Sequence, residues 1–296
     1  MSVVSVTGPV ALSGVVESHG HSWIAPTGVR LSPVLDDFEG IAGDLTAFAV
    51  AGGVALVDCQ PPDTGRDVER LVALSERSGV AIVAATGFHL RRYYAEPGIW
   101  AQDADAVEAF FTRELQEGPA GFVKAAVPAD PEACDVPRLL GAAARAALAT
   151  GAMLLIHTER GEGLDALRRL LVAAGLPPRQ VMLSHVDKHP DHALHAELAA
   201  AGYLLGYDTF LRPKYDPDAN VWPLIAAMLD AGHAERLALG LDLADRELWR
   251  FSGHPEGLLA LPGSIAARLD AIGAPAAARD ALLGGNVLRR LEGLDA

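Results

Sequence analysis

The sequence is poor in the residues that characterise several common classes of protein. It has 296 residues but only two cysteines, Cys59 and Cys134, whose spacing fits neither a disulfide framework nor a cysteine metal site. Only three of its 24 basic residues are lysines, no basic run occurs, and the formal net charge is −14, which argues against nucleic acid as a partner. No stretch approaches the roughly 18 apolar residues of a membrane span, and the first residues lack the pattern of a signal peptide. We therefore expect a cytoplasmic protein with no membrane or nucleic-acid partner.

What the sequence does contain is a regular alternation of short β-rich segments and helical segments rich in alanine and leucine. Such alternation is typical of parallel βαβ units, and a hydrophobic content of 50% is enough for one large core. The candidate strands are Gly14–Glu17, Val54–Cys59, Ala81–Ala85, Gly121–Val127, Met153–His157, Val181–Ser184, Tyr203–Tyr207 and Leu237–Leu241; the clearest helices are Asp67–Ser78, Val136–Thr150, Gly163–Ala174 and Asp191–Ala201. Eight strands favour a (β/α)8 TIM barrel, a single α/β domain over residues 1–296, over an open sheet, whose usual glycine-rich phosphate turn is absent.

Three connections are longer than a barrel needs, and each follows a candidate strand. They are Gly87–Asp103, Asp208–Val221 and Asp242–Gly263. The loops that follow the strands of a (β/α)8 barrel form its catalytic face, so we expect these three to build a substrate pocket. The C-terminal segment Ile265–Leu291 is expected to form helices that pack on the barrel.

Six residues of metal-ligand type stand where apolar runs end or are interrupted. They are His19 and His21 in SHGH, Lys124 in GFVKAAV, His157 in MLLIHT, His185 in VMLSHV and Asp242 in LALGLD. The carboxyl ends of barrel strands converge in space although they are far apart in sequence. His19 and His21 are two residues apart, so on an extended strand both imidazoles point the same way and can bind one ion.

Lys124 lies within an apolar strand, which is an unusual place for a lysine. It could simply reach the rim of the barrel or pair with a carboxylate. Burial instead favours the neutral amine, which can add carbon dioxide to become a carbamate, a carboxylate able to bridge two metal ions. Taken alone, the other residues also have simpler explanations, as capped or solvent-facing histidines and as an aspartate that begins a loop. Their joint order on strands one, four, five, six and eight is what favours a metal site.

With this ligand order the chain resembles the phosphotriesterase-like family of the amidohydrolase superfamily along essentially its whole length. Further similar segments are VTGPV near the start, DTGRD at Asp63–Asp67, AATGF at Ala84–Phe88 and GGNVLRRL at Gly284–Leu291. The resemblance implies that His19, His21 and Asp242 hold one divalent ion, that His157 and His185 hold a second, and that carboxylated Lys124 bridges them. The chain departs from the family at Gly20, where an acidic residue that is not a ligand is more common.

The implied chemistry is hydrolysis. Two ions about 3.5–4 Å apart make a bridging hydroxide available near neutral pH, and one of them polarises the substrate oxygen. Asp242 is the expected catalytic residue, since it can take the proton of the nucleophile and pass it to the leaving group. We expect zinc, although manganese, cobalt or iron also suit imidazole and carboxylate ligands.

Two loop segments carry the information on the substrate. HVDKHPD at His185–Asp191 and YDTFLRPKYDPDAN at Tyr207–Asn220 are similar to a subgroup that opens phosphorylated furanose lactones. That similarity implies a phosphate clamp of Lys214 and Arg246 with a tyrosine, Tyr94 or its neighbour Tyr93. Loops after strands seven and eight often bind phosphate in these barrels. The two cations could instead be surface charges paired with nearby acidic residues, and Arg212-Pro213 stands where a second lysine is common.

We therefore predict a metal-dependent lactonase acting on a phosphorylated sugar lactone. One alternative is hydrolysis of phosphotriesters or unphosphorylated lactones, which would not need Lys214 or Arg246. Another is a barrel that binds a ligand without turnover, which is disfavoured because the ligand set and the general base are both present. The only macromolecular partner that the resemblance implies is a second copy of the chain, in a homodimer.

Overall fold

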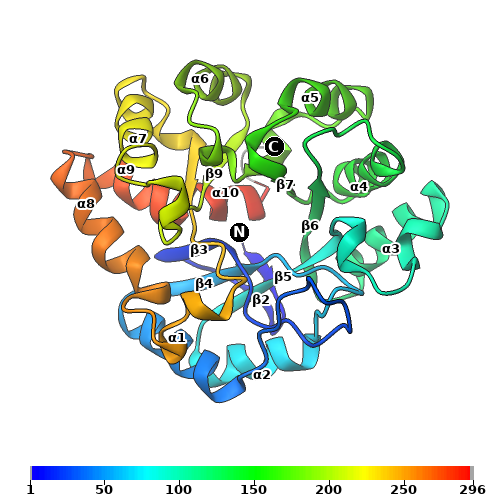
Figure 1. The fold of residues 1–296 in the computed structure, drawn as a ribbon, viewed down its shortest axis with the longest axis horizontal. Coiled ribbons are helices and arrows are strands. Elements are labelled where there is room, and N and C mark those ends of the chain that lie inside the picture. Colours follow the sequence, from blue (N-terminus) through cyan, green and yellow to red (C-terminus); the bar gives the residue numbers. More distant parts are fainter. Residues whose placement is uncertain (1, 294–296) are drawn as a thin grey trace.

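Eight parallel strands curve into a nearly closed barrel with helices outside it (Figure 1). This computed structural model describes residues 2–293. The strands are β3 (Val15–Gly20), β4 (Gly53–Asp58), β5 (Ala81–Phe88), β6 (Ala120–Val127), β7 (Leu154–Thr158), β8 (Val181–Ser184), β9 (Leu204–Tyr207) and β10 (Leu237–Leu239). They are hydrogen-bonded in chain order from β3 to β10. The predicted (β/α)8 barrel is confirmed, and each of the eight candidate strands corresponds to a strand of the barrel.

The helices form the outer layer. They are α1 (Phe38–Val50), α2 (Val68–Ser78), α3 (Ala104–Gln116), α4 (Val136–Thr150), α5 (Leu164–Ala173), α6 (His192–Ala201), α7 (Val221–Asp230), α8 (Ala266–Ala271), α9 (Ala276–Asp280) and α10 (Asn286–Leu291). The sequence analysis identified α2, α4, α5 and α6 but not α1, α3 or α7. Several helices begin after an aspartate whose carboxylate accepts a backbone N–H of the first turn, namely Asp37, Asp67, Asp103 and Asp191. No helix within residues 2–293 is both long enough and apolar enough to cross a membrane.

Apolar side chains fill the amino end of the barrel. Val16, Phe122 and Met182 are buried in one cluster inside the barrel, which Val287 and Leu288 of α10 join. A hairpin of β1 (Val3–Ser5) and β2 (Gly8–Val10), which the sequence analysis did not identify, also packs there. The other, carboxyl end of the barrel is where the polar residues that follow the strands gather, because all eight strands are parallel.

The first and last strands of the barrel are joined by two side chains and by a backbone hydrogen bond from the N–H of Asp242 to the carbonyl of His19, at 2.9 Å. The Oε1 atom of Glu17 accepts hydrogen bonds from the backbone N–H of Leu241, at 2.8 Å, and of His19, at 3.1 Å. The hydroxyl of Ser18 donates to the carbonyl of Leu239 at 2.8 Å. Gly240 allows this contact, because a Cβ there would lie 2.8 Å from Glu17 Oε1. We call these contacts the β3–β10 seam.

Glu17 is completely buried at the seam, and burial raises the pKa of its carboxyl to about 8. Substitution Glu17→Ala should lower the free energy of unfolding by about 3 kcal/mol, because it leaves two buried N–H groups without an acceptor. Glu17→Gln keeps an acceptor of the same size and should change stability much less. Urea unfolding of the metal-free protein measures both, with Glu76→Ala on the exposed face of α2 as the control. Equal losses in the alanine and glutamine variants would contradict the role of the seam.

Candidate metal centre

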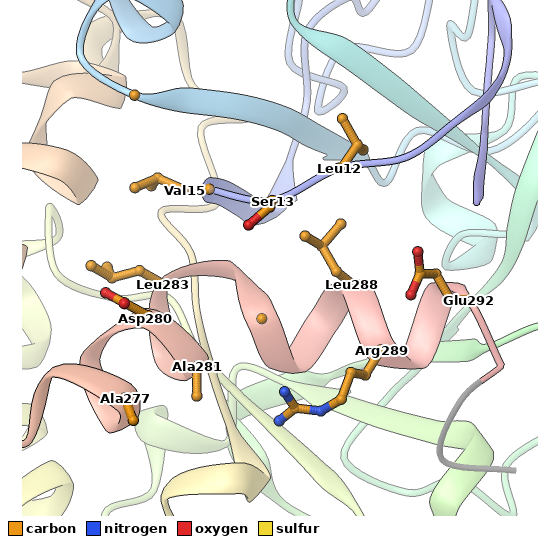
Figure 2. Close-up of a pocket in the computed structure, with 13 residues that line it drawn as sticks. Leu12, Ser13, Val15, Ala277, Asp280, Ala281, Leu283, Leu288, Arg289 and Glu292 are labelled. Carbon is orange, nitrogen blue, oxygen red and sulfur yellow. The ribbon is translucent and has the colours of Figure 1, made fainter. Parts of the chain in front are cut away.

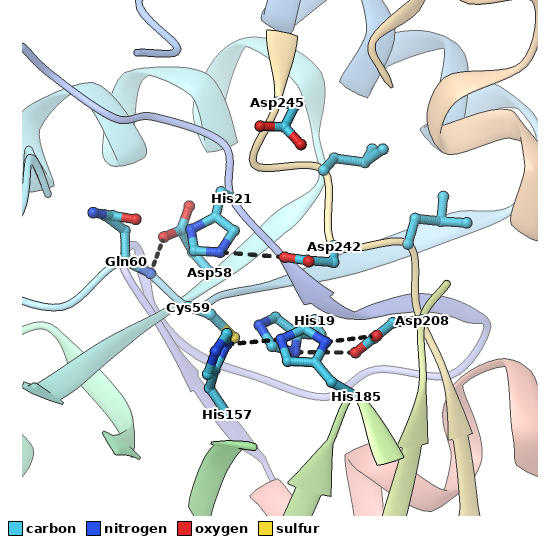
Figure 3. A network of polar contacts seen from close by, with 12 residues as sticks. His19, His21, Asp58, Cys59, Gln60, His157, His185, Asp208, Asp242 and Asp245 are labelled. Atoms are coloured by element: carbon cyan, nitrogen blue, oxygen red, sulfur yellow. Dashed lines mark hydrogen bonds and ion pairs between the residues drawn. The ribbon is translucent and has the colours of Figure 1, made fainter. Parts of the chain in front are cut away.

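The six predicted ligands all lie at the carboxyl end of the barrel, and Figure 3 shows five of them, the four histidines and Asp242. His19 is in β3, Lys124 in β6 and His157 in β7. The others lie just beyond strands: His21 follows β3, His185 follows β8, and Asp242 lies three residues beyond β10. All six side chains are buried or nearly so. Parallel strands in register therefore bring together side chains that are up to 223 positions apart in the sequence, from His19 to Asp242.

The ligand atoms approach one another closely. The Nε2 atom of His185 lies 2.8 Å from Nδ1 of His157, and Lys124 Nζ lies 3.4 Å from His19 Nε2. On the other side of the cluster, His21 Nε2 lies 3.8 Å from Asp242 Oδ1. The amine of Lys124 thus contacts His19, which belongs to one predicted ligand group. The two members of the other group, His157 and His185, contact each other.

Gly20, between the first two histidines, has Glu17 as its neighbour. A Cβ at Gly20 would lie 2.8 Å from Cγ of Glu17 and 3.3 Å from Cγ of Leu56. The departure from the family pattern noted in SHGH therefore has a steric reason, because Glu17 occupies the space that a side chain at position 20 would need.

The histidines of the cluster are held in the neutral form. Burial, aided by the charge of Lys124, lowers the pKa of His19 and His157 well below the usual value of 6.5, and burial with Lys188 does the same for His185. Burial also lowers the pKa of His21. A neutral imidazole offers the lone pair that a metal ion needs.

Asp208, the residue after β9, lies close to two of these histidines and was not among the predicted site residues. Its Oδ1 lies 2.7 Å from His185 Nδ1 and its Oδ2 lies 3.2 Å from His19 Nδ1. Burial and the nearby Asp187 raise the pKa of Asp208, whose carboxyl accepts a hydrogen bond from His185 when the neutral imidazole carries its proton on Nδ1. In that tautomer His185 presents a lone pair on Nε2 toward His157, as metal-bound histidines usually do. The sequence showed Asp208 only as the first residue of a long loop.

The residues present suit divalent metal ions. Ligand atoms of His19, His21 and Asp242 all lie within 4.8 Å of one another, and so do those of His19, His185 and Asp208. The buried Nδ1 of His21 has no hydrogen-bond partner among the described residues. Imidazole and carboxylate donors are the set that zinc and its neighbours bind.

Strained backbone positions two of the ligands. His185 has a φ angle of 66° and Asp242 one of 49°, a region that non-glycine residues avoid. Arg212 fixes Asp242 by donating to its carbonyl at 2.6 Å and to its Oδ2 at 3.2 Å, and it also pairs with Asp245 at 2.8 Å. Such strain costs about 1–3 kcal/mol per residue and persists where the surrounding contacts determine the conformation.

A cavity of about 280 Å³ opens beside the cluster. Its lining includes His21, His157 and Asp242 from the predicted ligands, together with His89, Tyr93, Gln60 and Arg212. The loops that follow the first and the last strand of the barrel both contribute, with Leu31 after β3 and Asp245 after β10. The cavity is thus continuous with the ligand cluster and large enough for a small molecule.

None of the three predicted substrate-binding residues lines this cavity. Tyr94 is buried, and its hydroxyl accepts the backbone N–H of His89 at 2.9 Å, whereas its neighbour Tyr93 lines the cavity. Lys214 is exposed, with Nζ 5.0 Å from the centre of the Tyr215 ring. The side chain of Arg246 is 45% exposed and pairs with Asp37 at 3.0 Å.

Another cation, not predicted from the sequence, lies close to the cluster. Lys188 is half-buried, is 5.8 Å from the same Tyr215 ring as Lys214, and contributes to the lowered pKa of His185. In the sequence, the signal that could have connected Lys188 with the cluster is its position in HVDK, three residues after His185. Lys188 and Lys214 thus converge on one ring beside the candidate metal centre.

A larger cavity of about 520 Å³ lies at the amino end of the barrel (Figure 2). It is lined by the segment before β3, including Leu12 and Ser13, and by Leu288 and Arg289 of α10. The described residues of its lining include no histidine and no lysine. Size alone therefore does not identify the functional site in this protein.

Comparison with known proteins identifies the family to which the chain is related. A sequence model of the phosphotriesterase family matches residues 1–271. A phospho-furanose lactonase of Mycoplasmopsis agalactiae is 28% identical over 238 residues, which cover 71% of this chain and 67% of that protein. An uncharacterised protein of Mycoplasma pneumoniae is 29% identical over 231 residues, or 69% of this chain and 65% of that protein. The chain thus matches about two thirds of the length of these relatives.

The fold also has a close counterpart among solved structures. A lactonase of Listeria monocytogenes superposes with a TM-score of 0.86 at 22% identity, covering 100% of this chain and 98% of the other. At this level of identity, the similarity shows the shared fold.

Metal-free protein should lose stability on acidification in part through His185. Its folded-state pKa lies well below 6.5, so as the pH falls below 6.5 the unfolded chain binds the proton first and the folded state is disfavoured. One such group contributes at most about 1.4 kcal/mol per pH unit. Urea unfolding at pH 7, 6 and 5 should therefore show a smaller pH dependence for His185→Asn than for the wild type. Equal slopes would mean that His185 has the same pKa in the folded and the unfolded protein.

Proposed function

The chain belongs to the phosphotriesterase family, and from that premise we propose that it is a metal-dependent hydrolase whose substrate is a small lactone carrying a phosphate group. The observation that carries the proposal is the convergence of four neutral imidazoles, Lys124 and Asp242 beside one cavity. A ligand-binding barrel without turnover would not require this complete set.

Two ions would be held by the predicted groups. His19, His21 and Asp242 would bind one, and His157 and His185 the other, with Lys124 carboxylated by carbon dioxide between them. The contact of Lys124 Nζ with His19 Nε2 supports this place for the bridge. Zinc, or manganese, cobalt or iron in its place, would supply an activated water and polarise the substrate carbonyl.

Asp242 would transfer the proton. Its carboxylate lies at the cavity wall, is held by Arg212 at Oδ2, and faces His21 with Oδ1. A carboxylate fixed in this way can accept a proton from the attacking water and return it to the leaving oxygen of the opened lactone. Because Arg212 also holds the carbonyl of Asp242, the proton acceptor stays in place throughout.

The phosphate preference rests on the cations at the rim. Lys214 and Arg246 stand in the loops after β9 and β10, and in this proposal their long side chains would turn toward the cavity to bind the phosphate. Lys188, which shares the Tyr215 ring with Lys214, adds a third positive charge. Tyr94 would support the site through the backbone of His89. The name of the Mycoplasmopsis relative, a phospho-furanose lactonase, agrees with this preference.

Kinetics on a matched pair of 1,4-lactones, with and without a 5-phosphate, tests the substrate. We expect kcat/KM to be at least about tenfold higher for the phosphorylated lactone, since charged hydrogen bonds contribute about 1.5–3 kcal/mol each. Lys214→Ala and Arg246→Ala should raise KM for that lactone and leave the unphosphorylated one unchanged. Arg169→Ala, on the outer surface of α5, is the control. Equal rates on both lactones would reject the phosphate clamp but not the hydrolase.

Metal analysis tests the ligand groups separately from the substrate. After loading with zinc, the wild type should hold about two ions per chain and His157→Asn about one, because one group loses a ligand while the other is intact. Asp242→Asn should lower kcat by at least about a hundredfold, since it removes the proton acceptor. A wild type that binds no more than one ion would contradict the binuclear centre.

A further inference from the structure

His89 is a cavity residue that is not among the predicted ligands. It is the first residue after β5, and its ring lies 4.4 Å from that of Tyr93 and 5.5 Å from that of His157, measured between centroids. Its backbone N–H is tied to the Tyr94 hydroxyl. The ring is therefore held between the loop after β5 and one of the metal-ligand histidines.

One nitrogen of His89 is already occupied. The backbone N–H of Leu90 points at Nδ1 at 2.7 Å, so Nδ1 must act as the acceptor and carry no proton. A neutral ring with an accepting Nδ1 has its proton on Nε2. His89 thus has one N–H bond to donate.

This arrangement argues against a role for His89 as a metal ligand. Nδ1 is engaged by Leu90, and Nε2 carries the proton, so neither nitrogen offers a lone pair. The donor instead belongs to a side chain that lines the same cavity as Asp242. A preorganised neutral donor in a buried site stabilises an oxygen that gains negative charge during reaction.

We propose that His89 is a catalytic hydrogen-bond donor, whose Nε2–H binds the substrate oxygen that gains negative charge as the ester bond breaks. The proposal rests on the hydrolase function proposed above. His89 keeps its proton throughout, so no bond to hydrogen is broken at this residue and Asp242 still transfers the proton to the leaving oxygen. His89 and Asp242 would therefore divide two tasks between them, stabilisation of charge and transfer of a proton.

Substitutions at position 89 can separate a donor from a filler of space. In His89→Gln the side-chain amide N–H reaches about as far as Nε2 of histidine, whereas in His89→Asn it reaches only as far as Nδ1. His89→Leu has a similar volume and no donor. We expect kcat to fall about a hundredfold in the leucine and asparagine variants and less than tenfold in the glutamine variant, with little change in KM.

His254 offers a matched control. Its Nδ1 also accepts backbone N–H groups, from Glu256 at 3.2 Å and Gly257 at 3.0 Å, but it does not line this cavity. His254→Leu should leave kcat within about twofold of the wild type, as expected for a substitution outside the site. Zinc content should be the same in all variants of His89, because no ligand is changed.

Nitrogen NMR of the metal-loaded protein, labelled in histidine, tests the tautomer without turnover and should show Nε2 protonated and Nδ1 unprotonated in His89. The opposite tautomer would overturn the proposal, as would equal kcat in the wild type and His89→Leu, or equal losses in the leucine and glutamine variants. Reduced zinc content in His89→Leu would show a metal ligand instead. A wild type that hydrolyses neither lactone would overturn the proposed function and the role of His89 with it, whereas failure of the variants alone overturns only His89.

Discussion

Closure of the barrel between β3 and β10 is the constraint on which the site depends. His19 and His21 belong to the first strand of the barrel and Asp242 follows the last, so these side chains meet only if the two strands lie side by side. Glu17 provides much of the closure, because a single oxygen of its carboxyl group accepts a backbone N–H from each side. The same atoms that complete the sheet therefore set the spacing between the ligands.

In the rest of the site, burial keeps the side chains in the protonation state that a divalent cation would require. The imidazoles are kept neutral because the barrel interior excludes water, and Asp208 and Arg212 fix the orientation of His185 and Asp242. The positive φ angles of His185 and Asp242 point to the same conclusion, since backbone strain is retained where its removal would move a ligand. The imidazoles are neutral, the carboxylates are oriented and the backbone is strained in the protein without metal. The candidate site is therefore arranged in advance of binding.

The sequence was most informative where burial leaves a pattern. Parallel strands that are buried on both faces appear as continuous apolar runs, and polar residues at their ends stand out, as His157 and His185 did. The strands β1 and β2 are only three residues long and left no such pattern. Asp208 was visible only as a polar residue of a loop, and Arg212 only as a residue standing where a second lysine is common, so the sequence connected neither of them with the metal centre.

The position of the rim cations could not be predicted for a different reason. Lys214 and Arg246 lie in loops whose course depends on tertiary contacts, such as the pairing of Arg246 with Asp37 on a segment more than 200 residues earlier. His89 was missed because its chemistry follows from one local hydrogen bond, from Leu90 to Nδ1, which no spacing of residue types reveals.

The contact between Gly20 and Glu17 has a consequence for how this barrel can change over evolutionary time. A side chain at position 20 has room only after the one at position 17 has become smaller, because a Cβ at position 20 would lie 2.8 Å from Glu17 Cγ. A change at Gly20 alone would force Glu17 away from the seam, whereas a change at Glu17 alone loses the seam contacts. Acquisition of an acidic residue between the histidines is therefore coupled to the side chain at position 17, and the two positions are expected to change together.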